Sequence, residues 1–156
     1  MANKKTQIAV AAILNYLGVD LVVDTKEHRL EMQKAIYLAH AAGVKLGYSY
    51  NWYVNGPYCA ALADDYYEAA RDNLAPLRVS RELEAKLKSV KMVIEDKPRT
   101  TTKAGWLEAT ASLDYMWRVQ MVSEDNLIEA CKKHKPHLGN ILEPALGSLK
   151  THGLID

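Results

Sequence analysis

The feature that most constrains this chain is the sequence Asn55-Gly56-Pro57-Tyr58, which lies between two segments of helical periodicity. The residue before a proline is disfavoured in the helical region of the backbone map, so Gly56 interrupts any helix that reaches it. Pro57 has no amide N–H to donate, and helices tolerate proline only in their first turn. The sequence therefore predicts a sharp joint, with Pro57 as the first residue of a new helix.

The segments on either side of this joint have distinct patterns. Before it, apolar and long side chains recur at i+3 and i+4, which predicts a central helix ending at Gly43 or Gly47. Tyr48 to Val54 is aromatic and β-prone, so we expect an extended segment or hairpin near residues 48–55. After the joint, a third helix ends near Asp72. The residues that set the two helical registers are Leu30, Gln33, Lys34, Tyr37, Leu38 and Ala41, and Cys59, Leu62, Ala63, Tyr66, Tyr67 and Ala70.

The rest of the chain also predicts helices separated by polar or proline-containing connectors. Helices are expected over residues 5–17, 81–94, 103–119 and 124–134, and a last one from 140 or 143 to 153. Residues 19–24 are either a short strand or a turn, and residues 74–79 and 95–102 are connectors. The predicted fold is mainly α: a single-domain helical bundle of residues 1–156, with six to seven helices and the short extended segment or hairpin.

Composition excludes several classes of protein. Twenty basic and 19 acidic side chains nearly cancel, which leaves no global field for non-specific nucleic-acid binding. The apolar run from Ile8 to Leu14 is interrupted by Asn15 and continues as a helix, and no run approaches the ~20 residues that span a membrane. Two distant cysteines do not form a CxxC pair. We expect a cytoplasmic protein that does not bind membranes.

The histidines do not form a recognisable catalytic or metal-binding pattern. The sequence contains five of them, and none has HExxH spacing. His134 and His137 are three residues apart, but Pro136 lies between them and breaks the helical face they would need to share. The sequence also lacks the GxSxG, P-loop and GxGxxG motifs. We therefore expect neither a metal nor a cofactor, and we predict that the protein is not an enzyme.

Two further groups are weaker catalytic candidates. Asp64, Asp65 and Glu68 form a short acidic cluster that would suit Mg²⁺ or acid–base chemistry, although the solvated face of an amphipathic helix has the same pattern. Cys59 lies at a predicted helix N-terminus, a position that lowers a thiol pKa. No histidine lies near it in the sequence to act as a base. A small-substrate enzyme using these residues is the least favoured hypothesis.

A compact basic patch offers a different function. Lys132, Lys133 and Lys135 follow one another closely and would suit phosphate groups or an acidic partner. Cations are also favoured at a helix C-terminus by the helix dipole, which is the more ordinary interpretation. A nucleic-acid-binding regulator that uses this patch is the alternative to the function inferred below.

The aromatic composition points to the region around the joint. The chain contains nine tyrosines and three tryptophans but no phenylalanine. Tyrosine and tryptophan suit interfaces because they combine an apolar body with a polar group, but tyrosine can equally replace phenylalanine in a core. Both interpretations remain open for residues 48–58. The candidate partner-binding residues are Trp52, Tyr53, Asn55, Tyr58 and Asp65, with Gly56 and Pro57 as the structural turn.

These residues also carry a family resemblance. Leu30 to Leu38 resembles the "LQKLxYLxQ" helix of YwgA-like proteins, and more remotely that of the Panacea (SocA-like) antitoxin domain. Tyr53 to Tyr58, followed by Leu62 and Asp65, is similar to their "YxxGPYSxxLxxD" element. Leu138 and the segment from Ile141 to Ile155 are similar to a terminal helix that closes in "GLI". Cys59 departs from the pattern, because the usual residue there is small and polar.

The resemblance carries an expectation about function. Sequences of this kind occur in phages and mobile elements. The Panacea likeness implies an antitoxin or adaptor that works by protein contact, with a toxin as a possible partner, whereas the YwgA-like proteins offer no activity to transfer. Together with the missing catalytic set, this predicts a non-catalytic protein-binding module of the antitoxin or adaptor type.

Overall fold

The computed structural model describes residues 3–74 and 77–156. Within these ranges, seven α helices and one short hairpin form a mainly helical domain, which confirms the predicted fold class. Residues 75–76 of the expected 74–79 connector lie outside the described residues. The elements are α1 (Lys4–Leu17), α2 (Lys26–Ala41), β1 (Asn51–Tyr53), β2 (Gly56–Tyr58), α3 (Ala60–Arg71), α4 (Arg81–Glu95), α5 (Lys103–Arg118), α6 (Glu124–His134), a 3₁₀ turn (Pro136–Leu138) and α7 (Leu142–Thr151).

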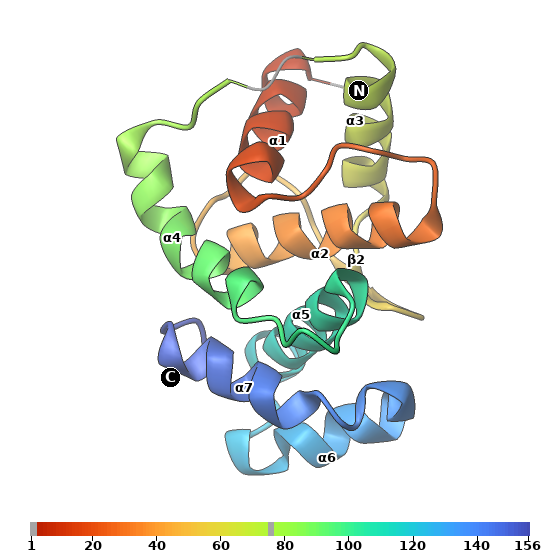
Figure 1. Ribbon diagram of the computed structural model, residues 1–156, viewed down its shortest axis with the longest axis vertical. Helices are drawn as coiled ribbons and strands as arrows, with labels where there is room; N and C mark the ends of the chain where they lie inside the picture. Colours follow the sequence, from red (N-terminus) through yellow and green to blue (C-terminus); the bar gives the residue numbers. More distant parts are fainter. Residues whose placement is uncertain (1–2, 75–76) are drawn as a thin grey trace.

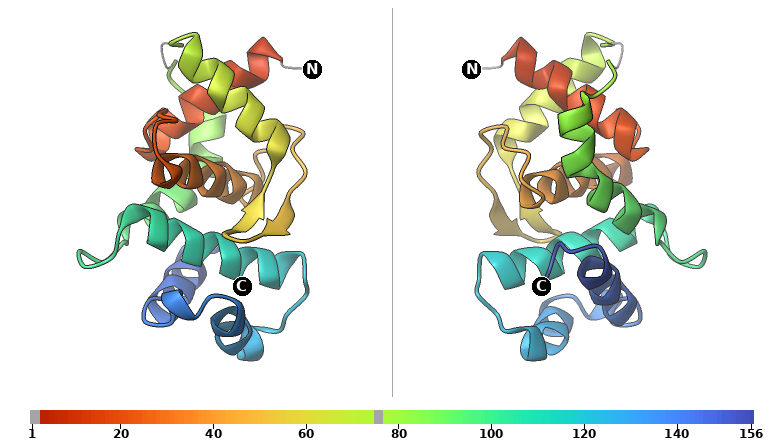
Figure 2. Two further views of the ribbon diagram at one scale, coloured as in Figure 1. Left: turned by 90° about the vertical axis from the view of Figure 1, so that its right-hand side faces the viewer. Right: turned by 90° about the vertical axis from the view of Figure 1, so that its left-hand side faces the viewer.

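Helices α2 and α5 cross the middle of the molecule and make its most extensive interhelical contact (Figure 1). Helices α1, α3 and α4 lie on the α2 side, whereas α6 and α7 pack on α5. The hairpin lies on one flank, where β2 contacts both α2 and α5 (Figure 2). A continuous apolar core links the helices, with Trp106 and Tyr37 among its largest fully buried side chains. The two central helices therefore position the hairpin.

The helix starts follow from local capping. Asn3, Thr25, Ser80 and Thr102 each accept a hydrogen bond from a backbone N–H of the helix that follows. Such caps satisfy amide groups that have no partner inside the helix, and each contributes about 1 kcal/mol. Residues 19–24 form no strand; the segment is irregular, with a bend beginning at Asp24. In the described part of the chain, no helix is both long and apolar enough to cross a membrane.

The joint itself differs from the prediction. Pro57 does not begin a helix: it lies in β2, opposite Trp52 of β1, and α3 begins only at Ala60. Cys59 is the N-cap residue of α3, and its side chain makes no capping hydrogen bond. The prediction was wrong because side chains of α2 bind the backbone of residues 57–59 and hold it extended. Local sequence contains no signal for these contacts.

Gly56 is required by two separate features of the hairpin. Its φ of 98° lies in the left-handed region, which strongly favours glycine. A Cβ atom at this position would also lie 2.5 Å from Oγ of Ser112 on α5, far inside van der Waals contact. A side chain at residue 56 would therefore require Ser112 or the hairpin backbone to move.

We predict that Gly56→Ala lowers the free energy of unfolding by about 1–3 kcal/mol, because the strained φ and the contact with Ser112 both oppose a methyl group. Urea denaturation monitored by circular dichroism measures this change. Gly147→Ala in α7 is the matched control, since a Cβ there meets no atom within 4 Å. Because alanine is the better helix former, the control variant should be neutral or slightly stabilising.

A second variant separates the two causes. Combining Gly56→Ala with Ser112→Ala removes the close Oγ atom but leaves the backbone strain, so the double variant should recover part of the loss. Equal stabilities of wild type and Gly56→Ala would contradict the positive φ described here.

Candidate binding site

Two adjacent side chains of α2 hold the second strand of the hairpin. The Gln33 amide pairs with both backbone groups of Cys59: it accepts from the N–H at 3.0 Å and donates to the C=O at 2.8 Å. Lys34 Nζ donates to the carbonyl oxygen of Pro57 at 2.6 Å. These backbone groups lie in a buried part of the chain, where unpaired polar groups are costly. We call Gln33, Lys34 and their three hydrogen bonds the β2 clamp.

Lys135 holds the hairpin from the opposite direction. It follows α6, and its Nζ donates to the carbonyl oxygen of Val54 at the hairpin turn. The same ammonium group lies 3.2 Å from Oε2 of Glu108 on α5 and 5.2 Å from the centre of the Trp52 ring. Lys135 is only 1% exposed. The turn is therefore fixed by a buried lysine on each side: Lys34 through β2 and Lys135 through the turn itself.

The predicted basic patch is corrected by this geometry. Lys132 and Lys133 are exposed near the C-terminal end of α6, but Lys135 is buried and engaged with the hairpin. It was grouped with its neighbours because its role depends on a contact with Val54, 81 residues away in sequence. An exposed patch at this place contains two lysines rather than three.

The buried charges around the hairpin do not balance. Lys34 and Lys135 bring two ammonium groups, whereas, in the described ranges, Glu108 is the one carboxylate whose charge acts on Lys34. Glu108 Oε2 also lies 3.3 Å from Nε2 of His137, and the Asn55 amide lies 3.5 Å from it. The pKa of Lys34 is lowered from 10.5 to about 7: burial is the main cause, Glu108 opposes the shift, and Lys135 adds to it.

The aromatic residues near the hairpin divide into core and surface. Trp52 is half-buried and packs on Tyr115 of α5, with ring centres 5.6 Å apart. Tyr53 is 53% exposed and Val54 is 86% exposed at the turn. The Tyr53 ring meets that of Tyr58 edge to face at 5.2 Å. Trp52 thus anchors the hairpin, while Tyr53 and Val54 face solvent and Tyr58 lies between the two environments.

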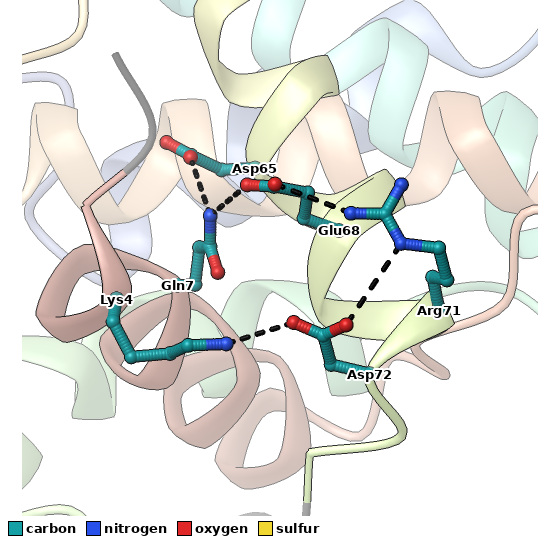
Figure 3. Close-up of polar contacts among 6 residues, drawn as sticks. All are labelled: Lys4, Gln7, Asp65, Glu68, Arg71 and Asp72. Carbon is teal, nitrogen blue, oxygen red and sulfur yellow. Dashed lines mark hydrogen bonds and ion pairs between the residues drawn. The ribbon is translucent and has the colours of Figure 1, made fainter.

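Asp65 lies away from this surface, in a structural network between α1 and α3 (Figure 3). Its carboxylate is buried and accepts hydrogen bonds from the Tyr48 hydroxyl at 2.6 Å and from the Gln7 amide at 3.3 Å. Glu68 accepts from the same Gln7 amide. Asp64, its sequence neighbour, is exposed, so the predicted acidic cluster splits between a buried and a solvated face.

A cleft opens beside the hairpin, between α2, α3 and β2. Its volume is about 190 Å³. Of the described residues, those around it include three cations and three tyrosines but no carboxylate. They are Lys26, Arg29, Leu30, Gln33, Lys34, Asn55, Tyr58, Tyr66 and Tyr67. A second hollow, lined by Tyr53, Val54 and Gly56, shares Lys34, Asn55 and Tyr58 with the first. The cleft is therefore continuous with the exposed turn.

Sequence reasoning identified Asn55 and Tyr58 but missed the cations of the cleft. A usable signal was present in the helical pattern. Lys26, Leu30 and Gln33 fall on one face of α2, and Arg29 and Lys34 flank it. We interpreted that face as core because Leu30 and Gln33 share it. Lys26, Arg29 and Lys34, however, place charges on or beside this face, and an unpaired charge is too costly to bury in an apolar core.

No family model, curated protein or solved structure shows a significant match to this chain. Within residues 3–74 and 77–156, no group of three or more histidine, cysteine, aspartate or glutamate side chains is placed to hold a metal ion. Functional inference therefore starts from the geometry of the hairpin and its cleft.

We predict that Lys34→Met changes the pH dependence of stability. Between pH 7 and 10.5, the unfolded chain binds a proton at Lys34 that the folded chain does not, so this group makes the wild type more stable as pH rises. Methionine does not titrate. The unfolding free energy of wild type minus that of Lys34→Met should thus increase by roughly 1 kcal/mol per pH unit from pH 7 to 9.

Urea denaturation at half-unit intervals from pH 6 to 9 measures this difference. Lys26→Met is the matched control, because Lys26 is exposed at the start of the same helix. A difference between wild type and Lys34→Met that stays constant from pH 7 to 9 would show that the Lys34 ammonium is not destabilised by burial.

Proposed function

We propose that this chain is a non-catalytic module that binds a protein partner, with the hairpin turn and the adjoining tyrosines as its docking surface. The observation that carries the proposal is the exposure of Tyr53 and Val54 on a turn whose backbone is bound by buried lysines on both sides. Apolar side chains at a mobile tip would be ordinary. Exposed apolar side chains on a turn whose backbone is fixed by hydrogen bonds suggest that the turn binds a partner.

The physical basis is preorganisation. Binding costs free energy when loops and side chains must be ordered, so a surface that is already fixed retains more of its contact energy. Gly56 against Ser112, the β2 clamp and Lys135 remove that cost at the turn. Tyrosine suits such a surface because it supplies a large contact area with only two rotatable bonds.

The resemblance to YwgA-like proteins and the Panacea domain supports a narrower version of the proposal. The residues that carry it, Gln33-Lys34 and Gly56-Pro57-Tyr58, are the ones that build and hold the hairpin. On that basis, we propose an antitoxin or adaptor that acts in the cytoplasm on a toxin-like protein. The nucleic-acid alternative has less support, because Lys135 is buried and leaves two lysines in the patch.

The test is capture of a partner by the intact protein. We expect the product of an adjacent gene to co-purify with it, and to be toxic when expressed alone. The double variant Tyr53→Ala/Val54→Ser should weaken capture by roughly ten-fold or more, since truncating a central aromatic contact commonly has that effect. Its melting temperature should stay close to that of the wild type, because both side chains are exposed.

Met121→Ser is the matched control. Met121 is 80% exposed, like Val54, but lies in the loop between α5 and α6. Capture should survive this change. Equal capture by the wild type and by Tyr53→Ala/Val54→Ser would place the docking surface elsewhere, and harmless neighbours that do not bind would contradict the toxin-like partner.

A further inference from the structure

The cleft beside the hairpin is lined by cations and tyrosines. Among the residues that the structure describes, Lys26, Arg29 and Lys34 line it and no carboxylate does. Arg29 is oriented by a hydrogen bond from its Nη1 to the carbonyl oxygen of Val23 at 2.7 Å, which leaves its other N–H groups available. Lys26 is exposed at the entrance. A cleft with this lining attracts an anion.

Lys34 adds unused hydrogen-bonding capacity at the cleft. An ammonium group has three N–H donors, and the Pro57 carbonyl oxygen accepts one of them. Glu108, the carboxylate that acts on Lys34, is already in contact with Lys135 and His137. The buried cluster therefore carries one more ammonium group than carboxylate when Lys34 is protonated. An incoming anion would correct this imbalance.

We infer that this cleft receives a carboxylate of the protein partner, from an acidic side chain or from a chain terminus, while the hairpin turn contacts the apolar surface around it. The inference rests on the proposed function. Charge complementarity selects an anion, and the cleft shares Lys34, Asn55 and Tyr58 with the hollow below the exposed turn. Carboxylates are the anions that an unmodified protein partner can supply.

This arrangement makes binding dependent on pH. The bound carboxylate favours the ammonium form of Lys34, whose pKa burial lowers to about 7, so affinity should fall as pH rises above 7. The charged groups that act on Lys34 are Glu108 from α5 and Lys135 from the segment after α6. Lys26, Arg29 and three tyrosines line the same cleft, and the charge of Asp64 on α3 acts on one of them, Tyr58. His137 reaches the same cluster through Glu108, so its titration needs a control.

The experiment is an NMR titration of the intact ¹⁵N-labelled protein with four probes at pH 6.5. Acetyl-triglutamate amide carries side-chain carboxylates, and acetyl-trialanine carries only a chain-terminal one. Acetyl-triglutamine amide carries neither, and a thymidine hexanucleotide carries phosphates. We expect at least one carboxylate probe to shift the amide signals of Lys26, Leu30 and Tyr58, with the uncharged peptide silent.

The variants then assign the contact. Lys26→Gln and Lys34→Met should each lower the affinity for the carboxylate probe roughly three- to ten-fold, whereas Lys133→Gln on α6 should leave that affinity unchanged. From pH 6.5 to 8.5, affinity should fall about ten-fold in the wild type and in His137→Gln, but stay nearly constant in Lys34→Met. Equal binding of the uncharged peptide, binding of the oligonucleotide alone, or equal effects of Lys26→Gln and Lys133→Gln would overturn the inference.

Partner capture distinguishes this inference from the function on which it rests. If Tyr53→Ala/Val54→Ser abolishes capture but Lys26→Gln/Lys34→Met does not, the hairpin is the docking surface and the carboxylate site is wrong. If neither double variant affects capture, the hairpin docking surface and the carboxylate site are both wrong. Circular dichroism melts of each variant at pH 6.5 confirm that the comparison is made on folded protein.

Discussion

The contact between α2 and the backbone of residues 57–59 is the interaction on which the rest of this structure depends. Gln33 and Lys34 occupy successive positions on α2, and together they bind Pro57 and Cys59. An edge strand of three residues has too few partners to be stable alone, since isolated two-stranded hairpins are marginal in water. Because α2 is a central helix of the fold, its side chains give β2 the fixed support that a longer sheet would otherwise supply.

Holding the hairpin in this way requires burying charge. A lysine taken out of water loses hydration that one carbonyl oxygen does not replace, and the low pKa of Lys34 expresses that loss. Lys135, in contrast, forms an ion pair with Glu108. The structure thus contains one buried ammonium that is paired and one that is not, and the unpaired one lies at the cleft. Stability is lowered at the place where a bound anion would restore it, which is a common arrangement at binding sites.

The sequence predicted the helices well because their signals are local. Periodic apolar positions predict α4 and α5 to within about a residue at each end. The hairpin was only partly predicted, since Pro57 suits a helix start as well as an extended strand. What decides between them is Lys34, 23 residues earlier in the chain. Likewise, Lys135 is indistinguishable from Lys133 until its contact with Val54 is known. Local patterns cannot encode such distant pairings, so the sequence indicated a hairpin near residues 48–55 but not the contacts that hold it.

The most direct test of this account is hydrogen exchange at the Cys59 amide, which donates to the Gln33 side chain rather than to another backbone group. The account predicts slow exchange of this amide in the wild type, close to that of buried amides in α5. In Gln33→Ala, protection at Cys59 should fall by at least ten-fold while α5 remains protected, and Gln120→Ala, an exposed glutamine after α5, should change neither. Rapid exchange of Cys59 in the wild type, or unchanged protection in Gln33→Ala, would contradict the claim that α2 holds the hairpin.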